Sequence, residues 1–172
     1  MAGITNALLT TVKKTKFANM SSIYNFKQVN SLLACAGQPT ETQLKQLVEE
    51  KYQVIINLAM PTGKFALPNE DAIVKELAID YLPIPVVFDN PQLSELLAFF
   101  KHMDQHFGKK TMVHCAANYR ASVFTGLYLF NKGELDAEQM QLFIEDVWQP
   151  DDIWQQFIDE CLEYLREVKG ES

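Results

Sequence analysis

The chain has 172 residues, of which 48% are hydrophobic and 22% are charged. These proportions are typical of one globular domain with a buried core, and they exclude a disordered or collagen-like chain. No apolar run approaches the roughly 18 residues that a membrane-spanning helix needs. Fifteen Lys and Arg residues against 22 Asp and Glu residues give a net charge of -7, so we expect neither nucleic acid nor a membrane as a partner.

The three cysteines, Cys35, Cys115 and Cys161, are too few and too widely spaced for a disulfide framework. The first twenty residues lack the apolar core and the cleavage site of a secretory signal. We therefore expect a cytoplasmic protein with a flexible arm over residues 1–20 and a single domain over residues 21–172. Nothing in the sequence indicates the oligomeric state.

Short apolar runs alternate with amphipathic segments from about residue 30 onward, a pattern typical of the α/β class. Strands are predicted at residues 32–36, 53–59, 81–88 and 110–114. Helices are predicted from a capping box of Thr40 and Gln43 to residue 51, over 69–79, from Pro91 to 107, and over 121–131, 136–148 and 151–168. The chain is thus predicted to be an α/β protein whose C-terminal third is helical.

The most informative segment follows the 110–114 strand and runs directly into a helix, the position at which α/β folds bind ligands. It reads His114-Cys115-Ala116-Ala117-Asn118-Tyr119-Arg120-Ala121-Ser122. Cys115 would face the free amides and the positive dipole end of that helix, which favour a thiolate nucleophile. The amides of residues 116–120 would form an anion cradle, and Arg120 could hold two oxygens of a phosphoryl group.

Three neighbouring residues would support this loop. A loop that turns its amides inward needs a positive φ angle, and without a glycine Asn118 is the best suited residue. Ser122 could donate a hydrogen bond to the thiolate or assist its departure. We expect His114 to bond backbone groups and tune the thiol rather than to act as a base. Tyr119 and Phe88 could line the mouth of the pocket.

These residues resemble the cysteine-dependent phosphatases of the protein tyrosine and dual-specificity class, which carry His-Cys, a phosphate-binding loop, Arg and a nearby hydroxyl residue. Those enzymes have five residues between Cys and Arg, whereas four separate Cys115 from Arg120. The shorter loop, Gly37 to Thr40 and Ile56 to Leu58 are together similar to a small bacterial phosphatase-like family, related to the domain joined to β-lactamase-like hydrolases. The resemblance covers roughly residues 22–133.

The resemblance implies a three-layer phosphatase-like fold with a short, mostly parallel central sheet, and hydrolysis of a phosphorylated protein or small molecule without metal or cofactor. Cys115 would attack phosphorus to form a cysteinyl-phosphate, which water would hydrolyse. Asp89 matches the position of the general acid in such enzymes. Glu70 and Asp71 are fallback acids.

Other interpretations stay open at this point. A six-residue loop from Cys115 through Arg120 also resembles that of rhodanese-type sulfurtransferases, in which Cys115 would carry a persulfide. A non-catalytic phosphate-binding module is a third possibility, since a shortened loop has fewer amide donors. Arg120 could instead form an ordinary surface ion pair, and Asp89 could simply cap a helix. His102 and His106 have metal-ligand spacing, but the sequence shows no further ligands beside them, so we expect no metal.

Overall fold

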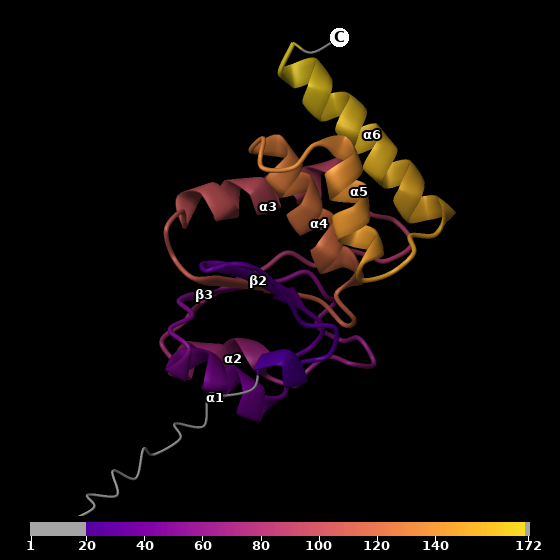
Figure 1. Ribbon diagram of the computed structural model, residues 1–172. Helices are drawn as coiled ribbons and strands as arrows, with labels where there is room; N and C mark the ends of the chain where they lie inside the picture. Colours follow the sequence, from indigo (N-terminus) through magenta and orange to yellow (C-terminus); the bar gives the residue numbers. More distant parts are fainter. Residues whose placement is uncertain (1–19, 171–172) are drawn as a thin grey trace, which may run out of the picture.

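The computed structural model describes residues 20–170 (Figure 1). The arm predicted over residues 1–20 lies outside the described residues, except for Met20, which begins the short 3-10 helix η1 (Met20–Ser22). After η1 the chain forms a central sheet between two layers of helices. The predicted α/β class and the three-layer arrangement are confirmed.

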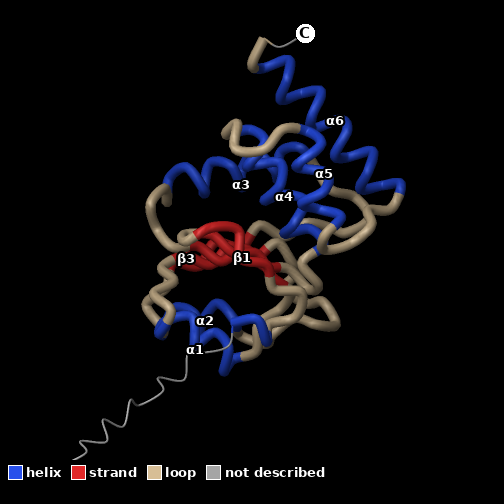
Figure 2. The backbone as a smooth tube through the Cα atoms, viewed as in Figure 1, coloured by secondary structure: helices blue, strands red, loops and turns tan. Residues whose placement is uncertain are grey.

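Within residues 20–170 the sheet has five strands, in the order β1 (Lys27–Asn30), β2 (Leu33–Ala36), β5 (Thr111–His114), β3 (Val54–Asn57) and β4 (Asp80–Pro83). β1 pairs antiparallel with β2, and the remaining pairs are parallel. All residues of β2, β3 and β5 are buried, because helices cover both faces of the sheet (Figure 2). The sheet is short and mostly parallel, as the resemblance implies.

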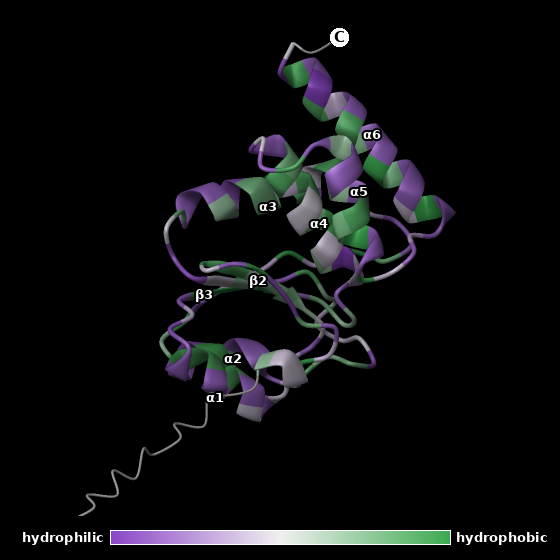
Figure 3. Cartoon of the chain, viewed as in Figure 1, coloured by the Kyte–Doolittle hydropathy of each residue, from purple (hydrophilic) through white to green (hydrophobic). Residues whose placement is uncertain are grey.

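The helices form two unequal layers (Figures 1 and 2). On one face lie α1 (Glu41–Glu49) and α2 (Glu70–Glu76). The other face carries α3 (Leu93–Gln105), α4 (Tyr119–Asn131), α5 (Ala137–Glu145) and α6 (Asp152–Val168), which confirms the helical C-terminal third. Figure 3 shows hydrophobic and hydrophilic residues alternating along α6. None of the described helices combines the length and the apolar character that a bilayer crossing requires.

Two strand predictions differ from the structure. The sequence pattern does not predict β1, because Lys-Gln-Val-Asn is polar and only half-buried at the edge of the sheet. The strand predicted over residues 81–88 is regular only as far as Pro83. Beyond Pro83 the chain still follows β3, because the Ile84 amide donates to the Asn57 carbonyl at 2.8 Å and the Val86 amide to the Leu58 carbonyl at 3.0 Å. Pro83 and Pro85 alternate with these donors, so their missing amide protons fall on the open side of this edge strand.

Two helix starts also differ. Pro91 does not open α3, which begins two residues later, where Gln92 and Glu95 form a capping box. α4 begins at Tyr119, two residues before the predicted start, because Asn118 turns the chain directly from the loop into the helix. This earlier start places Arg120 within the first turn of α4.

The parallel register brings the ends of three strands to one edge of the sheet. His114, the last residue of β5, lies beside Ala36 of β2 and Asn57 of β3. The segments that follow these strands therefore converge at this edge, where α/β folds bind ligands. Cys115 begins the segment that leaves the central strand.

Candidate active site

The segment from Cys115 to Asn118 joins β5 to α4 and packs against the residues after β2. The Cys115 amide donates to the Ala36 carbonyl at 3.2 Å, and the Gln38 amide donates to the Ala116 carbonyl at 3.0 Å. Asn118 has a φ angle of 68° and precedes α4. The loop thus takes the left-handed conformation at the residue that the sequence indicates.

Two residues outside the loop hold its backbone. A Cβ atom on Gly37 would lie 2.8 Å from the Ala116 carbonyl oxygen, so glycine is what lets the two segments approach this closely. The side-chain amide of Asn25 donates to the Ala117 carbonyl at 3.0 Å. Asn25 could not be predicted as a site residue, because no local pattern marks a contact between residues 92 positions apart.

The loop carries amide groups that can serve a ligand. In the part of the chain that the structure describes, the Ala116 and Ala117 amides donate no backbone hydrogen bond. The Tyr119 and Arg120 amides belong to the first turn of α4, where helical amides have no partner within the helix. Together with the positive end of the α4 dipole, these donors can hold an anion in front of the loop.

Arg120 is 7% exposed and points its guanidinium to the interior. The Nη1 atom donates to the Val86 carbonyl at 2.7 Å, and the Nε atom has no hydrogen-bond partner among residues 20–170. No ion pair of the described residues includes Arg120, so the interpretation as a surface ion pair is wrong. A buried guanidinium with an unused donor and no carboxylate beside it is suited to receive an anionic ligand.

Arg120 and Ala116 line a cavity of about 190 Å³ beside the loop. Residues 63–66 form part of its wall and bring a second cation, Lys64, to it. A neighbouring cavity of about 610 Å³ has a largely apolar wall that includes the exposed rings of Tyr24 and Phe65. The two cavities share Gln38, Phe65, Ala66 and Ala116, so an anion site and an apolar groove adjoin each other.

The three cysteines are free and buried, but they differ in their surroundings. Burial raises the pKa of the Cys35 thiol to about 12 and that of the Cys161 thiol to about 12. Both stay protonated at neutral pH and are poor nucleophiles, as expected of structural cysteines. Cys115 is 1% exposed and directly precedes Ala116, which borders the cavity of Arg120.

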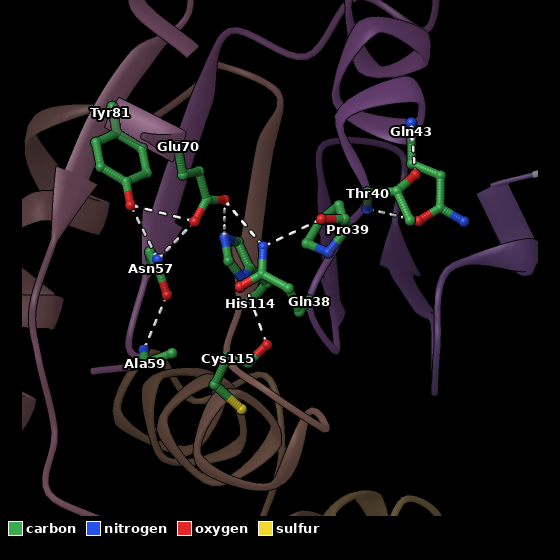
Figure 4. A network of polar contacts seen from close by, with 10 residues as sticks. All are labelled: Gln38, Pro39, Thr40, Gln43, Asn57, Ala59, Glu70, Tyr81, His114 and Cys115. Atoms are coloured by element: carbon green, nitrogen blue, oxygen red, sulfur yellow. Dashed lines mark hydrogen bonds and ion pairs between the residues drawn. The ribbon is translucent and has the colours of Figure 1, made fainter. Parts of the chain in front are cut away.

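A buried polar network lies behind the loop (Figure 4). The His114 Nε2 atom lies 2.7 Å from a carboxylate oxygen of Glu70, an ion-pair contact whose angle is not that of a hydrogen bond. The other ring nitrogen, Nδ1, lies 3.3 Å from the Cys115 carbonyl oxygen. The His114 ring and the Cys115 sulfur point away from each other, so the ring contacts the backbone of Cys115. This geometry agrees with the backbone-bonding role expected for His114.

Three more side chains surround the Glu70 carboxylate, which is almost fully buried. The Asn57 amide donates to Oε2 at 2.9 Å, the Gln38 amide to Oε1 at 3.4 Å, and the Tyr81 hydroxyl to Oε2 at 3.4 Å. Burial raises the pKa of Tyr81 to about 12, and the charge of Glu70 adds to the rise, so this hydroxyl remains a donor. Glu70 does not line the cavity of Arg120. Its geometry does not support the fallback role of general acid.

Asp89 and Ser122 are not among the residues that line the cavity of Arg120. Asp89 is exposed and lines a different cavity of about 400 Å³, together with residues of α6. The chain just before it is nevertheless anchored to the site, because Val86 accepts the hydrogen bond from Arg120. The Ser122 hydroxyl is buried and donates to the Tyr119 carbonyl at 3.0 Å. In this arrangement its hydrogen bond supports the helix start rather than the thiol.

Aromatic packing connects the loop to the C-terminal helices. The Tyr119 ring stacks on Trp148, with centroids 4.5 Å apart and planes 6° apart. The Phe88 ring lies 5.7 Å from Trp154 of α6 and 5.8 Å from the Arg120 guanidinium. Tyr119 and Phe88 therefore pack against other rings and do not line the cavity of Arg120. The segment between α5 and α6 thus packs against the first residue of α4, and α6 packs against Phe88.

Similarity to a solved structure shows the family of this chain. No family model and no curated protein matches the sequence. A candidate phosphatase of the DUF442 family from Shewanella putrefaciens CN-32 is 34% identical, with a TM-score of 0.78 over 86% of this chain and 97% of its own. This chain belongs to the DUF442 family. The resemblance stated from the loop and its two accompanying motifs is confirmed.

More distant solved structures share the fold of this DUF442 protein. Tk-PTP in its active form is 20% identical, with a TM-score of 0.65 over 83% of this chain and 97% of its own. PTPMT1 in complex with PI(5)P is 15% identical, with a TM-score of 0.72 over 84% of this chain and 98% of its own. At these identities the likeness concerns the fold alone, and it confirms the phosphatase-like arrangement of sheet and helices.

Proposed function

We propose that this DUF442 protein is a phosphomonoester hydrolase that works through a cysteinyl-phosphate intermediate. The supporting observation is that Cys115, the amides of the loop and Arg120 follow one strand end, and that Ala116 and Arg120 of this segment line one cavity. A nucleophile, a set of amide donors and a guanidinium are the groups that phosphoryl transfer to a thiolate needs. Membership of the family supports the same reaction.

In the proposed reaction the Cys115 thiolate attacks phosphorus, and the bond from phosphorus to the leaving oxygen breaks. The loop amides and Arg120 stabilise the charge on the phosphoryl oxygens. Water then attacks the cysteinyl-phosphate, which releases phosphate and restores the thiolate. Since Cys115 is 1% exposed, we expect the Arg120 side chain or the 60–66 segment to shift when substrate binds.

Asp89 is the proposed general acid, which protonates the leaving oxygen and later activates water. It follows a segment that two side chains anchor near the loop: Arg120 donates to Val86, and the Trp154 ring nitrogen donates to Phe88 at 2.8 Å. The exposed carboxyl of Asp89 lines the cavity beside α6, so it would need to turn toward the substrate. Asp71, which is also exposed, stays the alternative acid.

The proposed substrate is a phosphorylated protein or small molecule. The cavity of Arg120 would hold the phosphoryl group, and the adjoining groove with Tyr24 and Phe65 would hold part of the leaving group. A reducing compartment such as the cytoplasm suits an enzyme that needs a free thiol, and all three cysteines are free.

A non-catalytic phosphate-binding module is the second candidate, because Cys115 has little exposed surface and Asp89 faces another cavity. Sulfur transfer is not favoured, since the structural relatives are phosphatases. A turnover assay with an aryl phosphate and with thiosulfate, run side by side, separates the three functions. Phosphate release without sulfur transfer supports the proposal, and phosphate binding without turnover supports the module.

Two variants complete this test. Cys115→Ser should abolish turnover and keep anion binding, because the amides and Arg120 remain. Arg120→Lys should weaken both turnover and binding, because an ammonium group cannot reproduce the two-nitrogen fork of a guanidinium. Full activity of Cys115→Ser would refute the cysteinyl-phosphate mechanism.

A further inference from the structure

Glu70 is an acidic side chain that the proposed reaction does not use, yet it is 5% exposed. A buried carboxylate is costly unless hydrogen bonds and an opposite charge compensate it. The surroundings of Glu70 supply both. Donors from β3, β4 and the segment after β2 surround its oxygens, and the His114 ring lies 2.7 Å away.

The donors define the charge state of the carboxyl. Asn57 and Gln38 approach Glu70 through amide nitrogens, which can only donate, and Tyr81 approaches through a hydroxyl that retains its proton. Three donors around one carboxyl favour its ionised form, which accepts from all of them. Glu70 is therefore a carboxylate in this network.

The position of the His114 ring follows from its two neighbours. The Nδ1 atom faces the Cys115 carbonyl oxygen, which can only accept a hydrogen bond, so Nδ1 carries a proton. The Nε2 atom lies 2.7 Å from a carboxylate oxygen of Glu70. The geometry thus places the ring between a carboxylate and the backbone of the nucleophile.

We propose that Glu70 is a positioning residue that acts on the nucleophile through His114. The carboxylate holds the His114 ring in one orientation, and the ring in turn holds the Cys115 carbonyl by donating from Nδ1. That carbonyl belongs to the same peptide group as the Ala116 amide, one of the free donors beside the cavity. Glu70 thereby fixes the direction of the first amide of the anion cradle. This inference rests on the proposed phosphatase function.

The first test compares Glu70→Gln with Glu76→Gln, which makes the same chemical change on the exposed side of the same helix. Glu70→Gln should lower kcat for an aryl phosphate by about 10- to 100-fold, because misdirected groups at a reacting centre cost rates of this order. KM should change by less than about threefold, since the amides and Arg120 still bind phosphate. Glu76→Gln should match the wild type. Unchanged kcat in Glu70→Gln would overturn the proposal.

The second test asks whether Glu70 acts through His114. Kcat is measured for His114→Asn, Glu70→Gln and the double variant, and thermal unfolding confirms that each folds. If the carboxylate acts through the ring, the double variant loses no more activity than the more damaged single variant. Multiplied losses in the double variant would show that Glu70 acts independently of His114 and would overturn the proposal.

A third measurement uses the wild-type chain, so its result does not depend on whether the Glu70 and His114 variants fold. The protein has three histidines, so nitrogen NMR of a histidine-labelled sample can be assigned with His102→Gln and His106→Gln. The Nδ1 atom of the His114 ring should carry a proton, because it faces the Cys115 carbonyl oxygen. A His114 ring without a proton on Nδ1 would overturn the proposal.

Alkylation of Cys115 by iodoacetamide tests the positioning role of Glu70 independently of the proposed phosphatase function, because the alkylation reaction involves no phosphate. Glu70→Gln should change the alkylation rate of Cys115 by about 10-fold, whereas Glu76→Gln should not. A wild-type protein without phosphatase activity but with this difference would refute the hydrolase and retain the positioning role. Equal alkylation rates in the wild type and Glu70→Gln would refute the positioning role.

Discussion

Asn25 and Asn118 connect the start of the domain to the candidate active-site loop through two hydrogen bonds. The Asn25 side-chain amide donates to the Ala117 carbonyl at 3.0 Å, and the Asn118 side-chain amide donates to the Asn25 carbonyl at 2.8 Å. Both residues have positive φ angles, 47° and 68°. The loop has four residues between Cys115 and Arg120 and no glycine. Its backbone is thus held by hydrogen bonds to a segment that precedes the first strand.

Removal of the Asn25 side chain is expected to lower both the stability and the activity of the protein. Asn25→Gly removes the side chain and still permits the positive φ angle, so its effect isolates the lost hydrogen bond. We expect the free energy of unfolding to fall by about 1 kcal/mol and kcat/KM to fall by about 10-fold. Lys51→Gly is the matched control, because Lys51 also has a positive φ angle but is exposed outside the site. Equal kcat/KM values in the two variants would contradict the bracing role.

Gly37 predicts a steric test of the same loop. The Cβ atom of Gly37→Ala would meet two backbone oxygens, at 2.8 Å from Ala116 and 2.9 Å from Tyr24. Because backbone must move, we expect a loss of about 1–3 kcal/mol in stability and a clear drop in kcat. In Gly126→Ala the new Cβ would meet only side-chain atoms, at 3.3 Å or more, so activity should persist. Denaturant unfolding and the aryl phosphate assay check both expectations, and a fully active Gly37→Ala would refute the close-packing argument.

Asp89 predicts a dependence on the leaving group. If it is the general acid, Asp89→Asn should lower kcat by about 100- to 10,000-fold for an alkyl phosphate, whose alkoxide leaves poorly without a proton. The loss should be much smaller for an aryl phosphate with an acidic phenol. Asp71→Asn serves as the comparison, since Asp71 is the alternative acid. Steady-state kinetics with both substrates decide between the two carboxyls, and an effect confined to Asp71→Asn would transfer the role to that residue.

Three buried groups predict a loss of stability at alkaline pH. Burial raises the pKa of Cys35 and Cys161 from 9.0 to about 12 and that of Tyr81 from 10.0 to about 12. Between about pH 9 and pH 12 the unfolded chain releases protons that the folded chain retains, so the free energy of unfolding falls as pH rises. Each group contributes a slope of at most about 1.4 kcal/mol per pH unit.

Urea unfolding between pH 7 and pH 11 measures this slope. Cys161→Ala should flatten it above pH 9, because one of the three groups is removed. These groups should add no slope between pH 7 and pH 8, where both the folded and the unfolded chain keep the protons. A free energy of unfolding that rises between pH 9 and pH 11 would contradict the assignment.

Features that depend on neighbours along the chain could be predicted from the amino-acid sequence. Thr40 and Gln43 form the predicted capping box, because each partner lies within one turn of the other. Asn118 takes the predicted positive φ, because the steric limits of a residue are its own. The order of Cys115, a short loop and Arg120 at a strand end likewise depends on adjacent residues, and it was sufficient to indicate the family.

The distant groups that contact the loop could not be predicted in this way, because folding brings them there. Asn25 gives no local signal and reaches Ala117 through the folded sheet edge. Glu70 is predicted from the sequence only as a fallback acid, yet folding buries it against His114. Asp89 lies near the expected position in the chain but faces another cavity. Such contacts follow from packing between elements that are far apart in sequence, where burial and hydrogen bonding, rather than local conformational preference, determine the partners of each side chain.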